Sequence, residues 1–122
     1  MAPKLTPRQQ AQLAWLTTVP PRLEKLNRLI EQMATMQADD ASIRAGARLL
    51  DEMKAQASGL SITALSDTFG YMGTLLRRSG GQQVRVRGLR EMLAGAKINL
   101  EGALRSASTP EPGAEDDRVS PS

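Results

Sequence analysis

Apolar residues recur along this chain at three- and four-residue steps, the spacing that places them on one face of an α-helix. One clear run has Leu23, Leu26, Ile30 and Met33, with Arg22, Lys25, Arg28 and Glu31 elsewhere on the surface. No stretch alternates apolar and polar residues over the length of a strand. Turn residues divide the pattern into five segments. We therefore predict five helices, of which the last is the longest, over about 83–107.

Two of these helices have clear start signals. Thr6, Pro7 and Gln9 form the pattern of a capping box with proline at the first helical position. Before the third helix, either Asp39 or Asp40 can accept hydrogen bonds from the first turn.

The signals for the second, fourth and last helices are less direct. Pro20 disfavours helical backbone at the residue before it, so we expect a break over 17–21 and a second helix after the prolines. Ser61 can cap the fourth helix. The last helix has three glycines at seven-residue steps along one side, which either admit a closely packed neighbour or are incidental in an alanine-rich helix. They are Gly88, Gly95 and Gly102.

The predicted fold class is therefore all-α. We expect an N-terminal helix within 1–18, acting as a lid, and an antiparallel four-helix bundle over 19–107. Residues 108–122 are rich in proline and acidic residues and show no periodicity, so we expect a disordered acidic tail there.

Composition narrows the chemistry. The chain has 122 residues and contains neither histidine nor cysteine, which rules out imidazole catalysis, thiolate nucleophiles, disulfides and the usual zinc sites. Asp67 and Glu91 stand alone, with nothing in the sequence that pairs them as an acid and a base. We expect no enzyme activity, no cofactor and no metal. There is also no apolar run long enough to span a bilayer, so we expect a cytoplasmic protein.

Charge is unevenly distributed. The net charge is +3, but the segment from residue 106 onward carries −3 and the rest of the chain +6. A nucleic-acid-binding surface would need more positive charge, with aromatic or glycine-rich segments among the basic residues to contact the nucleic acid. We therefore do not expect nucleic-acid binding. An acidic protein partner fits better, and an ordinary solvated face is the simplest explanation. The basic cluster comprises Arg77, Arg78, Arg85, Arg87 and Arg90.

Aromatic residues are few, and the apolar set is dominated by leucine, alanine and methionine. We expect the three aromatic residues, Trp15, Phe69 and Tyr71, in the core or at its edge. The methionines fall mostly at core periods, where their flexible side chains fill gaps. They are Met33, Met36, Met53, Met72 and Met92.

The segment 51–65 resembles the signature of histidine phosphotransfer domains, His-x-Leu-Lys-Gly-x-Ala-x-x-Leu-Gly-x-x-x-Leu, which lies on the second helix of an antiparallel four-helix bundle. In the same register, Asp51 stands in place of the phosphorylatable histidine, Met53 in place of leucine, and Lys54 matches the lysine. The other matches are small or apolar residues at helical spacing: Ala55, Leu60 and Leu65.

The resemblance implies a degenerate phosphotransfer domain that carries no phosphate on histidine. Such a domain would keep a docking face for a receiver domain or a histidine kinase in bacterial two-component or polarity signalling. A fixed charge at Asp51 could imitate a phosphorylated side chain. The simpler interpretation is that Asp51 and Lys54 form a solvated ion pair, at i and i+3, that only supports the helix.

Two functional hypotheses follow. In the first, a non-catalytic interaction module binds its protein partner through the exposed side of the third helix. In the second, the chain is an unrelated helical adaptor or assembly protein, such as a homodimer, that uses the last helix with Arg87 and Arg90. The partner-binding residues of the first hypothesis are Arg44, Arg48, Asp51, Lys54, Ala55 and Ser58.

Overall fold

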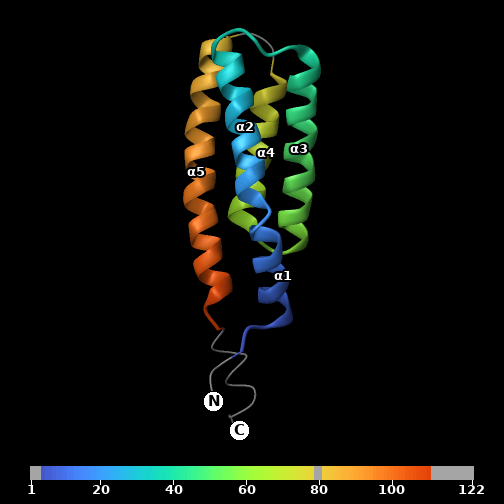
Figure 1. Cartoon of the computed structure of the whole chain (residues 1–122), viewed down its shortest axis with the longest axis vertical. Coiled ribbons are helices and arrows are strands. Elements are labelled where there is room, and N and C mark those ends of the chain that lie inside the picture. The colour runs from blue at the N-terminus through green and yellow to red at the C-terminus, as the bar shows by residue number, and fades with distance from the viewer. Residues whose placement is uncertain (1–3, 79–80, 111–122) are drawn as a thin grey trace, which may run out of the picture.

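The computed structural model describes residues 4–78 and 81–110, and within these residues it is all-helical (Figure 1). The all-α prediction is confirmed. Residues 111–122, which hold nearly all of the predicted acidic tail, lie outside the described residues. Ser108, predicted to begin that tail, is the last residue of a helix. The five helices are α1 (Pro7–Leu16), α2 (Val19–Ala34), α3 (Asp40–Gly59), α4 (Thr63–Arg77) and α5 (Gln82–Ser108).

Four of the helices, α2 to α5, pack side by side, and successive helices run in opposite directions (Figure 1). Among them, α3 and α4 share the most extensive contact and α2 and α3 the least. The first helix is not the lid that we expected. In Figure 1 it lies below α2, in the same column, and it packs mainly against the C-terminal half of α5.

Capping explains where α1 begins, as predicted. The Thr6 hydroxyl accepts a hydrogen bond from the Gln9 backbone N–H, and the Gln9 side-chain oxygen accepts one from the Thr6 N–H, both at 3.0 Å. The start of α2 differs from the prediction, because Val19 is already helical. Proline is tolerated in the first turn of a helix, where its missing N–H has no partner to lose. The break is therefore only the two-residue turn Thr17–Thr18.

The other two predicted caps behave differently. At the start of α3 the Asp39 carboxylate accepts a hydrogen bond of 2.7 Å from the Ser42 N–H. This bond lowers the pKa of Asp39, because it stabilises the ionised form. The prediction that Ser61 caps α4 is wrong. Ser61 has φ of 61° and lies in the corner between the helices, while the N-cap position of α4 is Ile62, which makes no side-chain cap bond.

The core lies between the four long helices and is built from the apolar stripes that the sequence shows. Phe69 is fully buried and Trp15 packs at the edge of the core, as expected. Two predicted core residues are on the surface instead: Tyr71 is 66 % exposed and Met36 is 78 % exposed. Met36 follows the end of α2 with φ of 61°, so the helical period no longer applies to it.

The three glycines of α5 are not equivalent. A Cβ atom added at Gly88 would lie 2.6 Å from a methyl group of Leu75 on α4, so this glycine allows the two helices to approach closely. Gly95 and Gly102 have nothing within 4 Å of the same position. The seven-residue repeat therefore does not mark one continuous packing surface. Within the described part of the chain, no helix is both long and apolar enough to cross a membrane.

Candidate interaction surfaces

All six residues of the predicted partner-binding set are exposed on α3. The structure also shows which neighbour they meet. Along most of the stripe, contacts are made with α4, so the exposed surface is the outer side of the α3–α4 seam. We call this surface the α3–α4 face. It comprises Arg44, Arg48, Asp51, Lys54, Ala55 and Ser58 of α3, together with Arg77 of α4.

Asp51 forms an ion pair across the seam with Arg77, and does not pair with Lys54 as the local interpretation suggested. Each of the two guanidinium nitrogens of Arg77 donates to one carboxylate oxygen of Asp51, with Nη1 to Oδ1 at 3.2 Å. This two-bond arrangement fixes the orientation of the carboxylate. The aspartate side chain is still 56 % exposed and the arginine side chain 49 %. A group outside the molecule can therefore reach both.

Two glycines of α4 make room for these side chains. The Lys54 side chain lies over Gly70, where an added Cβ would be 3.3 Å from its Cε atom. One turn further on, a Cβ at Gly73 would lie 3.3 Å from the Arg77 guanidinium and 3.8 Å from Asp51 Oδ1. The two glycines thus leave space on the surface of α4 for the side chains of Lys54, Asp51 and Arg77. The spacing of Gly70, Gly73 and Arg77 was visible in the sequence, but we did not connect it with Asp51.

At the C-terminal end of α3, hydrogen bonds between serine hydroxyl groups connect the same face to α4. Ser58 shares a hydrogen bond with Ser66, which is buried in α4 at 5 % exposure. Ser66 also donates to the backbone oxygen of Lys54 at 3.3 Å. Ser58 is therefore exposed but already engaged, whereas Ala55 presents only its methyl group. The α3–α4 face is a rigid surface with a charged half and a small-residue half.

Arginine side chains gather at the other end of this face, where α3 begins, α4 ends and α5 begins. They line a cleft of about 620 Å³, together with Asp40, Ile43, Ala47 and Leu76. We call it the arginine cleft. Its arginines are Arg44 and Arg48 of α3, Arg77 and Arg78 at the end of α4, and Arg85 of α5.

The basic cluster that the sequence suggested is therefore divided. Arg87 and Arg90 point to a different side of the molecule, along a depression of about 500 Å³ between the end of α2 and the start of α5. Arg90 is held there by Glu31 of α2, with the shortest nitrogen–oxygen distance 2.7 Å. Arg85 is only two residues from Arg87 in the sequence, but two residues along an α-helix are about 200° apart, so the two side chains face nearly opposite sides of α5.

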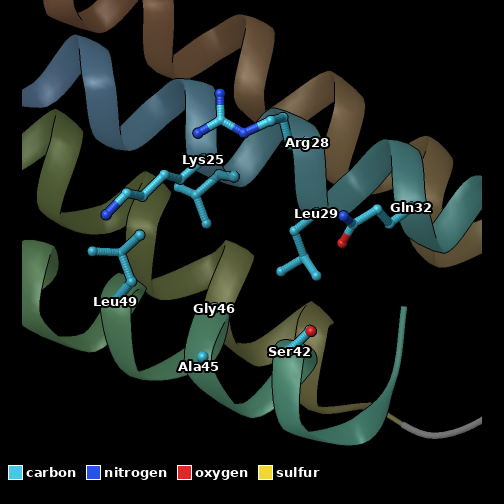
Figure 2. Close-up of a pocket in the computed structure, with 9 residues that line it drawn as sticks. Lys25, Arg28, Leu29, Gln32, Ser42, Ala45, Gly46 and Leu49 are labelled. Atoms are coloured by element: carbon cyan, nitrogen blue, oxygen red, sulfur yellow. The ribbon is translucent and has the colours of Figure 1, made fainter. Parts of the chain in front are cut away.

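A third depression follows the loose seam between α2 and α3, with a volume of about 390 Å³ (Figure 2). Leu29 points from α2 toward Gly46 of α3, where an added Cβ would lie 2.3 Å from a leucine methyl group. Beside this close contact the two helices separate. Leu49 of α3 lines the opening, and Lys25 and Arg28 stand on its α2 side.

Within residues 4–78 and 81–110, no group of three or more acidic side chains is arranged so that it could hold a metal ion. Comparison of the chain with protein-family models, with curated proteins and with solved structures finds no match.

Proposed function

We propose that this chain is a non-catalytic protein-interaction module that binds a protein partner on the α3–α4 face. In this proposal α2–α5 form an antiparallel four-helix bundle of the histidine phosphotransfer type, with Asp51 at the position of the phosphorylatable histidine. The partner is a receiver domain or a histidine kinase of bacterial two-component or polarity signalling. The module works in the cytoplasm and transfers no phosphate.

The observation that supports the proposal most strongly is the placement of Asp51. It lies in the middle of an exposed stripe, its carboxylate has a fixed orientation, and Gly70 and Gly73 keep the neighbouring helix low beside it. Apart from Arg77, which pairs with it, the carboxylate therefore has only glycines of α4 beside it, so that a partner can approach. An isolated helix-supporting ion pair would not need that clearance.

The pair with Arg77 also changes what Asp51 can contribute. Arg77 neutralises much of its charge, so the carboxylate is better suited to accept oriented hydrogen bonds than to imitate a doubly charged phosphate. The net attraction toward an acidic partner then comes from the cations around it, Arg44, Arg48 and Lys54. We expect the partner surface to be acidic, with hydrogen-bond donors opposite Asp51.

The test is a binding measurement against purified receiver domains and histidine kinase domains from the source organism. We expect one of them to bind the full chain, and Lys54→Glu to weaken that binding by about tenfold or more, because it places a negative charge against an acidic surface. Arg87→Glu, on the α2–α5 side, is the matched control and should bind normally. The proposal fails if no such domain binds, or if the two variants behave alike while both remain folded by circular dichroism.

One observation favours the second candidate, a homodimer formed through α5. Val84 and Ile98 are 71 % and 67 % exposed, and their spacing of fourteen residues places them on nearly the same side of the helix. Sedimentation equilibrium would detect the dimer, and Ile98→Glu should dissociate it. A monomer at all concentrations would exclude this candidate.

A further inference from the structure

The arginine cleft concentrates like charge more strongly than any other part of the described surface. Five of its nine lining residues are arginines and one, Asp40, is acidic. They come from three helices, so no single helix pattern brings them together. Like charges at this spacing repel one another, and they need no common cleft to remain solvated. A bound anion would remove that repulsion.

Two of the five guanidinium groups are held in place by the fold. Arg77 is fixed by Asp51, as described above. Arg85 donates to the backbone oxygen of Leu76 at 2.6 Å, in the last turn of α4, where helix carbonyl groups lack partners within the helix. The Arg77 and Arg85 side chains are therefore already held in place before a ligand binds. Binding then loses less side-chain entropy at these two residues.

The other three guanidinium groups retain their donors. Among the described residues, Arg44, Arg48 and Arg78 take part in no ion pair. Arg44 and Arg48 are one helical turn apart and so lie on the same side of α3, while Arg78 approaches from the end of α4. Guanidinium groups bind phosphate oxygens in pairs. Three such groups around one cleft offer more donors than a single carboxylate can accept, and their three positive charges exceed the charge of about −2 that one phosphate group carries.

We propose that the arginine cleft binds a ligand that carries two or more linked phosphate groups. This goes beyond the proposed function, although the cleft shares Arg44, Arg48 and Arg77 with the α3–α4 face. The charge is confined to one end of the molecule and does not form a track, which distinguishes the cleft from a nucleic-acid groove. Linked phosphates are supplied either by a soluble compound or by a phosphorylated lipid headgroup.

Titration calorimetry with sodium tripolyphosphate tests the soluble source, and flotation with vesicles of phosphatidylcholine containing a phosphatidylinositol bisphosphate tests the lipid source. Vesicles with phosphatidylserine at equal charge are the lipid control, and citrate at equal ionic strength is the soluble control. We expect saturable binding of one phosphate probe, with its control weaker by about tenfold or more, since a phosphate group offers an arginine more charge and more acceptor oxygens than a carboxylate does.

Arg78→Gln is the decisive variant, because Arg78 is exposed and lies outside the α3–α4 face. We expect it to weaken phosphate binding by about tenfold, the scale of one lost charged hydrogen bond, while Arg87→Gln leaves binding unchanged. Equal binding of the controls, equal loss in the two variants, or no binding of either phosphate probe would overturn the proposal. Lys54→Glu separates the two proposals, since it should impair the protein partner and not the phosphate ligand.

Discussion

The seam between α3 and α4 and the seam between α2 and α3 use glycine in opposite ways. On α4, Gly70 and Gly73 lie under polar side chains that cross from α3, so the seam is closed on its outer side by Lys54, Asp51 and Arg77. On α3, Gly46 instead receives the apolar end of Leu29, and the helices separate on either side of this contact. The first seam has the more extensive helix contact and carries charged and hydroxyl side chains at its surface. The second is a single contact beside a groove.

The comparison shows that a small residue does not by itself identify a packing interface. What matters is which side chain occupies the space that it leaves. A flexible charged side chain over a glycine stays accessible to a partner, whereas a buried leucine against a glycine fixes the distance between two helices. The experiments below test that difference, beginning with the largest expected effect.

Truncation of the core should distinguish the two seams most clearly. Phe69 is fully buried on α4, and we expect Phe69→Ala to lower the free energy of unfolding by about 3–5 kcal/mol. Leu29→Ala at the groove should lower it by about 2 kcal/mol or less, because one side of Leu29 already borders open space. Urea unfolding followed by circular dichroism measures both. Equal losses would mean that the α2–α3 seam is packed as tightly as the other.

The next largest effect on stability is expected at the contact between α1 and the end of α5, where the Gln9 amide is buried. Gln9 is 2 % exposed, and its Nε2 atom donates to the backbone oxygens of Ser106 at 3.2 Å and Thr109 at 2.6 Å. Gln9→Ala leaves these oxygens without their partner, and we expect a loss of about 1–3 kcal/mol in unfolding free energy. Gln10→Ala, at an exposed neighbour, should change stability by less than about 0.5 kcal/mol. Similar losses would show that the amide does not link α1 to α5.

Alanine at the two kinds of glycine should change stability in opposite directions. Gly70→Ala gains helix propensity, and Lys54 can move aside, so we expect a gain of about 0.5–1 kcal/mol. Gly46→Ala gains the same propensity but forces Leu29 to shift, and we expect a net loss of about 1 kcal/mol. Thermal unfolding measures both, with Gly95→Ala as the reference for open space. A gain at Gly46 would mean that the α2–α3 contact is not set by this glycine.

The smallest effect concerns the acid sensitivity of α3, the helix that both seams share. The pKa of Asp39 is lowered in the folded protein, chiefly by the hydrogen bond from the Ser42 N–H. Its contribution to stability is therefore present above the pKa of the unfolded chain and is lost as the pH falls through the lowered folded value. Asp39→Asn keeps a capping oxygen but does not titrate. The variant should lose less stability than the wild type between neutral and acidic pH, and identical pH profiles would contradict this.

Local features could be predicted from the sequence, and distant partners could not. The helices, the capping box at Thr6 and the cap at Asp39 depend on residues three or four positions apart, so the pattern contains all the information. The cap expected at Ser61 failed because the corner between α3 and α4 takes its geometry from both helices. The expectation that Tyr71 lies in the core or at its edge also failed, because the orientation of α4 places Phe69 inside and Tyr71 outside.

For the candidate surfaces too, local features could be predicted from the sequence and contacts between distant residues could not. The exposure of the six α3 residues follows from helical period, and it was predicted. The partner of Asp51 was not, because Arg77 lies 26 residues away and competed with the much closer Lys54. The arginine cleft required the ends of three helices to meet, and only Arg77, Arg78 and Arg85 of its five arginines were grouped beforehand.

The link that Gln9 makes to the end of α5 has a mechanical consequence. Because α1 begins where α5 ends, a force that pulls the two ends of the chain apart acts across the helices and not along them. Such a load would peel α1 away from α5 one contact at a time, starting at the Gln9 amide. A force applied between the corner at Ser61 and the start of α5 would instead draw α4 along its axis, so that all of its contacts resist together. The fold would therefore yield easily under the first load and resist the second.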